Sequence, residues 1–243
     1  MVLGLSRKKR REDSKDEGVP SEVLLSVLGM RKHRVPEGYK EVVTYPLKPP
    51  FSYAIIASNN RTSESLYIID ELTMDLEERE AFTKLYKLFE KELQAPREGQ
   101  TLQEALDEQI PILIEKNKKL TAGLTPVGLE RVLYYLERDI AGFGKIDPLM
   151  FDVAIEDISC TGFGKPLYIF HRDHENIRTT IQFGEKEIND FVMKLVHKAG
   201  KHISLSFPIV DATLPGRHRL AVTYGKEVTP SGTSFTIRKF RTD

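Results

Sequence analysis

Tryptophan is absent from this 243-residue sequence, and Cys160 is its single cysteine. One cysteine cannot build a disulfide framework or a four-ligand structural zinc site, so the composition favours a reducing, cytoplasmic setting. No apolar run approaches the roughly 20 residues of a membrane-spanning helix, and no stretch of signal-peptide length follows the N-terminus. The 36 lysines and arginines are balanced by 36 aspartates and glutamates, which argues against a dedicated nucleic-acid-binding protein.

The common catalytic motifs are missing as well. The sequence contains no glycine-rich loop ending in Lys-Ser/Thr, no Gly-x-Gly-x-x-Gly and no Gly-x-Ser-x-Gly. His171 and His174, with Asp173 and Glu175 beside them, could converge on a metal ion, but nothing supplies a third ligand. We therefore expect a solvated polar loop there and no metal site. Cys160 ends an alternating strand, which favours a small buried hydrophobe over a reactive thiol.

The first 38 residues divide into a tail and a short helix. Residues 1–17 are rich in charge and have no apolar residue after Leu5, so we expect residues 1–19 to form a disordered basic tail. Its basic cluster consists of Lys8, Lys9, Arg10 and Arg11. Residues 20–38 are predicted to form a short amphipathic helix and a linker, and the apolar face of that helix consists of Val23, Leu24, Val27 and Leu28. Such a short helix needs a partner surface.

Residues 39–145 are predicted to form a β-hairpin followed by a three-helix subdomain. Two β-rich runs, 53–57 and 66–69, are separated by a turn that contains two asparagines. Three segments then open with a capping residue and carry apolar residues at helical spacing. The caps are Asp75, Thr101 and Thr125. Pro111 is expected to kink the second helix or to end its first half.

Residues 146–243 are predicted to form a sheet domain with one covered face, which makes the whole fold α+β. One amphipathic helix spans Ile188 to Val196 and stops before Gly200. The remaining apolar runs are short and β-rich. They are 155–160, 167–170, 178–183, 203–207, 219–224 and 233–240.

Two arginines near the C-terminus suggest an anion site. Residues 178–243 contain 11 lysines and arginines against 6 aspartates and glutamates. If the last two strands pair so that their apolar residues match, alternation puts Arg219 and Arg238 on the same polar face. Facing arginines repel, unless both guanidinium groups hold one phosphate. Arg217 could join them, and the alternative is that these side chains simply point into water.

Several motifs together resemble the N-terminal region of archaeal ATPases of the type II and type IV secretion, pilus-assembly and archaellum-motor superfamily. The resemblance covers about residues 40 to 240 and is densest after residue 143. Its motifs are Phe143-Gly-Lys-Ile-Asp-Pro-Leu-Met, Ile155-Glu-Asp-Ile-Ser-Cys-Thr-Gly, Ala199-Gly-Lys-His-Ile-Ser, Pro208-Ile-Val-Asp-Ala-Thr-Leu-Pro and Ser234-Phe-Thr-Ile-Arg-Lys-Phe.

The resemblance implies a PAS-like sheet domain that works against a RecA-like core in a hexamer. In the family that core follows the sheet domain and binds most of the ATP and Mg²⁺, so this chain would be truncated before it and inactive alone. Arg219 and Arg238 match the family's phosphate-contacting arginines. Residues 215–219 read Pro-Gly-Arg-His-Arg where the family usually has Asp-Gly-Ser-Arg, so Arg217 and Arg219 are both candidates.

The implied function is ATP-driven rotation or assembly of an archaellum, or assembly of a pilin-like filament. Expected partners are the chain's own RecA-like domain, further copies of the chain, a polytopic membrane platform protein and motor accessory proteins. The amphipathic segment 23–28 and the basic tail are docking candidates, which implies a cytoplasmic protein at the inner face of the membrane. A stand-alone anion-binding or small-ligand-binding module is the alternative. Nucleic acid is discounted as a partner because Tyr224 and Phe235 fall on the apolar face.

Overall fold

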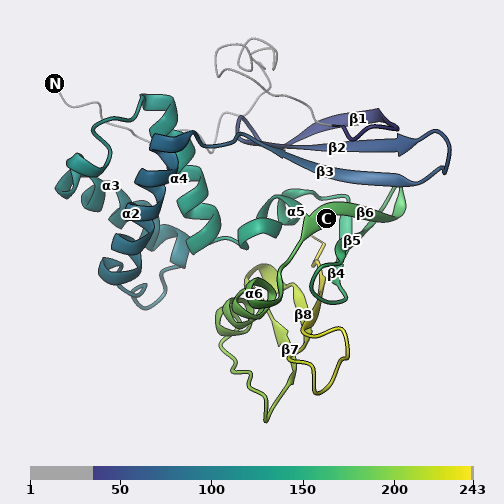
Figure 1. Cartoon of the computed structure of the whole chain (residues 1–243). Coiled ribbons are helices and arrows are strands. Elements are labelled where there is room, and N and C mark those ends of the chain that lie inside the picture. The colour runs from purple at the N-terminus through teal and green to yellow at the C-terminus, as the bar shows by residue number, and fades with distance from the viewer. Residues whose placement is uncertain (1–34, 242–243) are drawn as a thin grey trace. The chain divides into compact units, whose positions relative to one another are not determined.

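The computed structural model describes residues 35–241, which belong to one compact unit (Figure 1). The predicted basic tail, residues 1–19, and the docking residues of segment 23–28 lie outside the described residues. The predicted boundary between residues 145 and 146 stays a prediction.

The described residues contain nine strands that form one mixed sheet, in the order β1-β2-β3-β6-β5-β4-β9-β8-β7. Neighbouring strands are antiparallel except β3 and β6, which pair in parallel through only two residue pairs. The strands are β1 (Tyr39–Lys48), β2 (Ser52–Asn59), β3 (Ser65–Glu71), β4 (Ile155–Cys160), β5 (Pro166–His171), β6 (Glu175–Gln182), β7 (Ile209–Thr213), β8 (Arg219–Thr223) and β9 (Ser234–Arg238). With the helices described next, this confirms the predicted α+β class.

The helices begin where the capping residues predict. Residues 35–241 contain the α-helices α2 (Leu76–Glu92), α3 (Leu102–Lys116), α4 (Pro126–Ile140), α5 (Asp147–Phe151) and α6 (Glu185–Lys198), and the 3₁₀ turns η2 (Lys118–Leu120), η3 (Gly144–Ile146) and η4 (Pro215–Arg217). Asp75 caps α2 by accepting the Glu78 N–H at 2.9 Å, and Thr101 and Thr125 cap α3 and α4 in the same way. Pro111 does not end α3. It lies on the exposed side of that helix, where water can solvate the carbonyl that its ring leaves without a donor.

The predicted hairpin is present as β2 and β3, with β1 as a third strand beside β2. β1 gives little sequence signal because it is an edge strand with mostly exposed or half-buried residues and two register shifts. Its Tyr45 and Leu47 pack against the same core cluster as β4 and β5.

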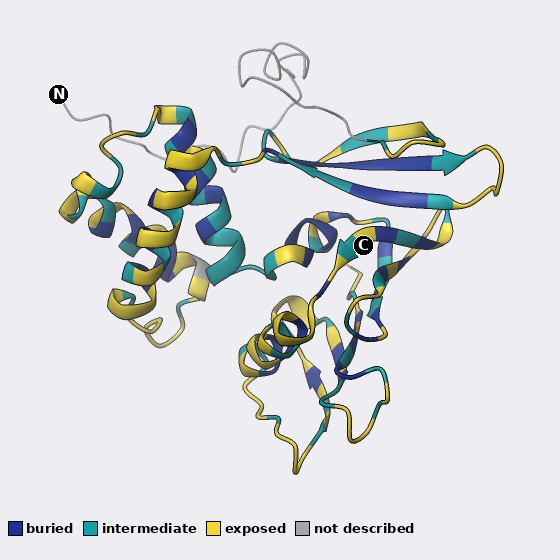
Figure 2. Cartoon of the chain, viewed as in Figure 1, coloured by how far each residue is buried: buried dark blue, intermediate teal, exposed yellow. Residues whose placement is uncertain are grey.

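Helix α6 covers one face of the strands β4 to β9. Its apolar residues Ile188, Val192, Leu195 and Val196 are buried against side chains that alternate along those strands. The alternation of buried and exposed residues along β5, β8 and β9 is visible in Figure 2. The three-helix part has a core of its own, built from residues of α2, α3 and α4 such as Phe89, Leu106 and Leu136.

The strand predicted at 203–207 is wrong. That segment is a tight turn in which Ser204 and Phe207 exchange two backbone hydrogen bonds of 3.2 and 3.1 Å. The strand begins only at Ile209, because Pro208 has no N–H for a ladder. The short helix α5 was not predicted either, since five residues carry no helical period.

His171 does not lie in a solvated loop, which corrects a second expectation. It is only 2% exposed, and its Nε2 lies 3.2 Å from the hydroxyl of Tyr45. Tyr45 and Tyr67 donate to the same carboxylate oxygen of Asp152, at 2.6 and 2.7 Å. Lys239 donates to the backbone oxygens of Leu149, at 3.0 Å, and Asp152. We call Tyr45, Tyr67, Asp152, His171 and Lys239 the buried polar cluster.

Burial sets the ionisation of this cluster. It raises the pKa of both tyrosines and lowers the pKa of His171, so that these three side chains are neutral near pH 7. Burial also lowers the pKa of Lys239 to about 8. The hydrogen bonds of the cluster connect β1, β3, the α5–β4 connection, β5 and the residue after β9.

Candidate functional site

The sheet face opposite α6 carries exposed side chains on β4, β5, β8 and β9. Successive residues of a strand point to opposite faces, so the partners of the buried residues form this second face. We call it the open face. Strand β7 adds exposed residues to the same face. The members of the open face are Asp157, Ser159, Tyr168, Phe170, Ile209, Asp211, Thr213, Arg219, Ala221, Thr236 and Arg238.

The strand register brings two arginines together on the open face. Leu220 pairs with Ile237 and Val222 with Phe235, which places Arg219 directly opposite Arg238. The sequence analysis expected both arginines on one face if their strands paired so that the apolar residues matched, and the strands do pair in this way. Directly opposite residues on one face have Cβ atoms roughly 5 Å apart, so the positive charges of Arg219 and Arg238 repel each other.

Asp157 is the next residue across the sheet from Arg238. One of its carboxylate oxygens accepts the Nε–H of Arg238 at 2.9 Å. This bond uses the Nε edge of the guanidinium group and leaves the edge formed by its two terminal nitrogens available for a second acceptor. Within residues 35–241, Arg219 has neither an ion-pair partner nor a side-chain hydrogen bond.

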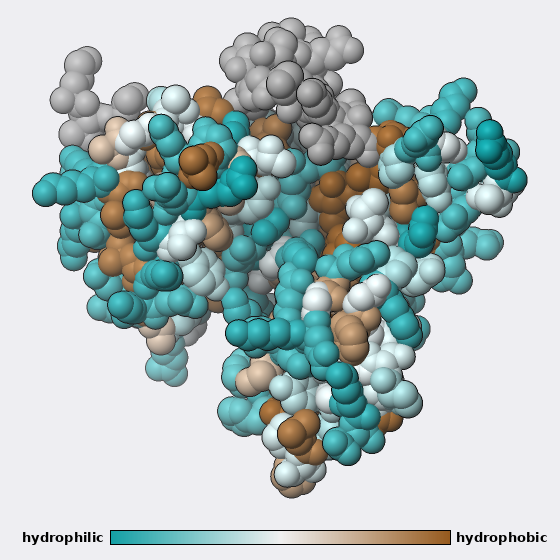
Figure 3. Space-filling model, in the orientation of Figure 1, coloured by the Kyte–Doolittle hydropathy of each residue, from teal (hydrophilic) through white to brown (hydrophobic). Residues whose placement is uncertain are grey.

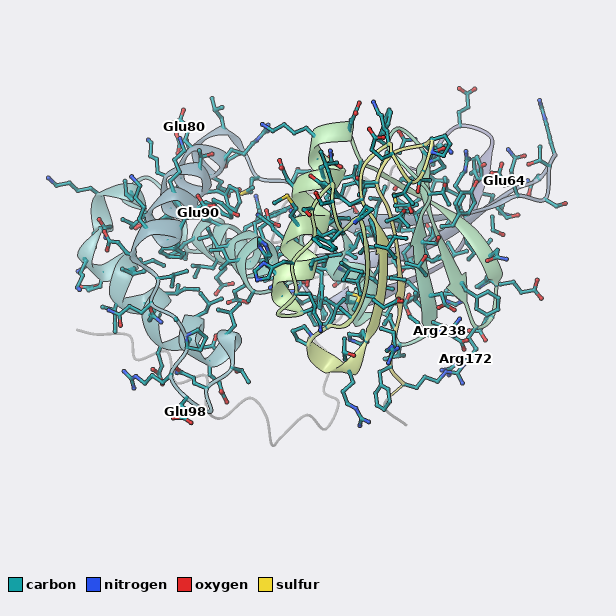
Figure 4. All side chains as sticks on the ribbon, turned by 90° about the horizontal axis from the view of Figure 1, so that it is seen from below. Glu64, Glu80, Glu90, Glu98, Arg172 and Arg238 are labelled. Carbon is teal, nitrogen blue, oxygen red and sulfur yellow. The ribbon has the colours of Figure 1, made fainter. Side chains whose placement is uncertain are left out.

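A further pair of arginines lies beside Arg238. Arg241 forms an ion pair with Glu156, and the Nε of Arg172 lies 3.9 Å from the same carboxylate. Arg172 follows β5 and Arg238 ends β9, and the acidic partners of these two arginines, Glu156 and Asp157, are consecutive residues of β4; both arginines are labelled in Figure 4. Together with Arg219 there are four arginines, and the carboxylates around them are Glu156, Asp157 and Asp211, the last of which lies diagonally across from Arg219 on β7.

Arg217 does not join the row that contains Arg219 and Arg238. It lies in η4, where both Gly216 and Arg217 have positive φ angles of 80° and 65°. That turn lays the guanidinium group of Arg217 over the ring of Phe240, 4.2 Å from the ring centroid. The next residue, His218, accepts the N–H of Phe240 at 2.9 Å through its Nδ1. The contact with Phe240 holds Arg217 at the end of β9.

Comparison with known proteins relates the chain to archaeal sequences. No family model matches it. It is 39% identical over 178 residues to the uncharacterized protein MJ1288 of Methanocaldococcus jannaschii, a match that covers 72% of this chain and 69% of that protein. The chain belongs to the MJ1288 family.

Two further relatives of this MJ1288-family chain come from the same organism. The uncharacterized protein MJ0900 is 36% identical over 118 residues, which are 48% of this chain and 21% of MJ0900. The uncharacterized protein MJ0781 is 28% identical over 101 residues, which are 42% of this chain and 14% of MJ0781. Most of both proteins therefore lies outside the shared segment.

A solved structure also shows a weak similarity. The VirB11 ATPase of the Brucella suis type IV secretion system, in complex with sulphate, gives a TM-score of 0.32 at 20% identity. The match covers 40% of this MJ1288-family chain and 29% of VirB11.

The sequence analysis missed three residues of the open face. Tyr168 and Phe170 project from β5 on this face, between the buried residues Leu167, Ile169 and His171. Asp157 is the acceptor for Arg238. The alternation of the run Leu167 to Phe170 contained the signal for the two aromatic residues. Asp157 could be assigned only from the pairing of β4 with β9.

The open face of this MJ1288-family member presents the guanidinium groups of Arg219 and Arg238 at directly opposite positions. Both arginines are exposed, and the polar side chains around them are small. Within residues 35–241, no three His, Cys, Asp or Glu side chains are arranged to hold a metal ion. In the described part of the chain, every helix is too short or too polar to span a membrane.

Proposed function

We propose that this chain is the regulatory, force-transmitting N-terminal region of a secretion-type ATPase, and that Arg219 and Arg238 contact the phosphates of ATP held by a RecA-like core. The observation that carries the proposal is the direct pairing of these two arginines on the open face. Like charges at opposed positions of a sheet destabilise it by up to about 1 kcal/mol. A phosphate shared by both groups turns that repulsion into two charge-assisted interactions.

The positions of the hydrogen bonds support the same role. Asp157 binds Arg238 only through Nε and so fixes the direction of its terminal nitrogens. Arg219 keeps its whole guanidinium group available among the described residues. Two such groups would draw the sheet domain towards the β- and γ-phosphates and stabilise charge during phosphoryl transfer. Loss of the γ-phosphate would weaken this attraction and let the domains separate, which couples hydrolysis to movement.

The relatives are consistent with a segment that works together with other domains. MJ0900 and MJ0781 contain the shared segment within much longer proteins. The motif resemblance supports a hexamer, with ATP and Mg²⁺ held mainly by the core. It also supports a role in an archaellum, pilus or secretion machine at the cytoplasmic face of the membrane. Arg217 would serve as a third phosphate contact if nucleotide binding released it from Phe240.

The test uses the chain together with its RecA-like core, and measures ATP turnover and ATP affinity. Arg219→Ala and Arg238→Ala together should lower turnover by about a hundredfold, since oxyanion contacts are typically worth a factor of roughly 100 to 1,000. Arg61→Ala, in the exposed β2–β3 turn, is the matched control and should change nothing.

Two outcomes would contradict the proposal. Unchanged turnover and affinity in the double variant would remove the arginines from the reaction. ATP hydrolysis by the purified chain alone would show that catalysis does not need the core. If the chain alone bound inorganic pyrophosphate tightly and no core affected that binding, a stand-alone anion-binding module would be the better account.

A further inference from the structure

The pairing of β8 with β9 ends in a hydrogen bond to a side chain. Arg238 is the last residue of β9, and the next residue, Lys239, donates its N–H to the backbone oxygen of Glu156 at 2.8 Å. Successive N–H groups of an extended chain point to opposite sides, so the N–H of Phe240 points back towards β8. Its acceptor there is Nδ1 of the His218 ring, at 2.9 Å. The imidazole takes the place of a backbone carbonyl.

This hydrogen bond fixes the protonation state of His218. A neutral imidazole has one nitrogen that accepts and one that donates, so the Nδ1 that accepts from Phe240 carries no proton and Nε2 carries one. A protonated imidazole donates from both nitrogens. Its Nδ1–H would face the N–H of Phe240, and two donors form no hydrogen bond. Protonation of His218 therefore removes the bond that ends the pairing of β8 with β9.

The surroundings of the His218 ring favour its neutral form. Partial burial lowers the pKa of His218 below its ordinary value of 6.5, and the positive charge of Lys239 lowers it further. The ring of Phe143, in the segment before η3, packs at 6.4 Å between ring centroids and carries no charge. The charged side chains of the two segments that hold the imidazole, 217–219 and 239–241, are all cations: Arg217, Arg219, Lys239 and Arg241. Near pH 7 the ring therefore accepts, and it is half protonated only at a pH below 6.5.

The residue that His218 holds is itself in contact with Arg217. Most of the described surface in view in Figure 3 is hydrophilic, and apolar residues gather in a few brown areas. Phe240 is an apolar residue that stays 42% exposed, and the guanidinium group of Arg217 covers one side of its ring, 4.2 Å from the centroid. A cation–π contact at an exposed site is weak, so it depends on the position of the ring, which the bond to His218 fixes.

We propose that His218 is a positioning residue for Arg217, which it holds on Phe240 while the imidazole is neutral and releases when the imidazole binds a proton. The proton comes from the solvent and binds to Nδ1. The N–H of Phe240 then loses its acceptor, the segment after β9 separates from β8, and the guanidinium group of Arg217 leaves the ring. Arg217, two residues before Arg219 in the chain, can then turn towards the open face. We call this the His218 switch.

The His218 switch goes beyond the proposed function because it needs neither a nucleotide nor a second domain. Its consequence for ATP, a third guanidinium group for the phosphates at low pH, rests on the proposed function. The two can fail separately, since spectroscopy of the chain alone tests the switch and anion binding tests the consequence.

The absence of tryptophan allows a direct test of the switch. Phe240→Trp in the full chain places a single indole beside Arg217 and keeps the backbone N–H that donates to His218. Its emission should change in one step as the pH falls, with a midpoint below 6.5. In the unmodified chain, NMR should show His218 with a proton on Nε2 alone at neutral pH, and the ring-current shift of the Arg217 side chain should disappear with the same midpoint.

Two substitutions of His218 in the Phe240→Trp chain are matched opposites. His218→Asn offers a side-chain oxygen close to the place of Nδ1 and does not titrate, so it should keep the neutral-pH emission and remove the step. His218→Leu has no acceptor, so its emission at neutral pH should equal the acid value of the Phe240→Trp chain. Arg61→Ala, in the exposed β2–β3 turn, is the control and should leave the step unchanged.

Arg217→Ala tests the consequence with inorganic pyrophosphate as the anion. Below the midpoint, this substitution should lower the affinity of the chain for pyrophosphate about tenfold, as expected for the loss of one charge-assisted hydrogen bond. Above the midpoint it should change the affinity little, because Arg217 is then held on Phe240. An equal effect at both pH values would overturn this consequence, whereas the spectroscopic step decides the switch itself.

Two results would overturn the His218 switch. One is a pH step of the same size in the His218→Asn variant, because another group would then cause it. The other is a neutral-pH emission in the His218→Leu variant equal to that of the Phe240→Trp chain, because Phe240 would then be held without the imidazole. Circular dichroism at neutral pH shows whether the variants fold, and the asparagine variant decides the question if the leucine variant does not fold.

Discussion

The buried polar cluster and the open face both contain several polar side chains of the sheet, but the two regions differ in how many of those side chains have a hydrogen-bond or ion-pair partner. In the buried polar cluster, one carboxylate of Asp152 accepts from two tyrosines and from the Ala154 N–H at 2.9 Å. On the open face, Asp157 pairs with Arg238 alone, and Arg219 has neither an ion-pair partner nor a side-chain hydrogen bond among the described residues. Complete pairing identifies a structural site, whereas incomplete pairing leaves groups available to a ligand.

We expect the largest difference between the two regions when one carboxylate is removed from each and the free energy of unfolding is compared. Asp152→Ala leaves three buried donors without an acceptor, so we expect it to lower the free energy of unfolding by about 3–5 kcal/mol. Asp157→Ala breaks an exposed ion pair and should cost less than about 1 kcal/mol. Urea unfolding measures both. Equal losses would mean that Asp157 is as structural as Asp152.

Asp147 is a second buried carboxylate. Among the described residues, the structure shows one hydrogen bond donated to it, against three donated to Asp152. Burial raises the pKa of Asp147 to about 6 from its ordinary value of 3.8. One of its oxygens accepts the Phe143 N–H at 2.8 Å. Because the folded state holds the proton more tightly, the stability present below pH 3.8 is lost as the pH rises through 6, and the deficit is constant above that.

Asp147→Asn keeps an acceptor for Phe143 and removes the charge. It should therefore raise the free energy of unfolding by about 3 kcal/mol at pH 7, since one pKa unit corresponds to about 1.4 kcal/mol. Near pH 3.5, below the ordinary pKa of an aspartate at about 3.9, the variant and the unmodified protein should be equally stable. Chemical unfolding across this pH range measures the difference, and a gain that did not depend on pH would contradict the assignment.

Removing one of the two facing arginines should have the opposite sign from removing either carboxylate, Asp152 or Asp157. Arg219→Thr relieves the repulsion with Arg238, and we expect it to stabilise the chain by about 0.5 kcal/mol at low salt. The thermal midpoint in a phosphate-free buffer is the measurement, with Arg61→Thr as control. A loss of stability would show that Arg219 has a structural partner.

The smallest expected effect comes from a ligand. Inorganic pyrophosphate at a concentration equal to its dissociation constant should stabilise the unmodified chain by about 0.4 kcal/mol, by mass action alone. The same addition should leave Arg219→Thr unchanged. Equal shifts in both proteins would place the anion elsewhere.

Elements governed by neighbouring residues were predictable. The caps at Asp75, Thr101 and Thr125, the apolar face of α6 and the alternation that puts Arg219 and Arg238 on the polar sides of their strands all follow from spacings of a few residues. Each depends on side chains that reach their own backbone, or on the two-residue period of a strand.

Features that depend on distant segments were not predictable. His171 is buried because Tyr45, 126 residues away in sequence, lies against it. The apolar residues at 203–207 read as a strand, but their backbone closes a turn and their side chains remain exposed. Asp157 accepts the hydrogen bond of Arg238 because β4 pairs with β9, which the sequence near Asp157 does not reveal.

Local chemistry was sufficient for the helix limits, the α+β class and the polar row that carries both arginines, because these depend on short-range hydrogen bonds and on side-chain alternation. The order of the strands, the identity of the buried polar groups and the exposure of the turn at residues 203–207 depend on the assembled sheet. Pairing between strands that are distant in sequence decides which face of a strand is buried and which residue lies opposite each of its residues.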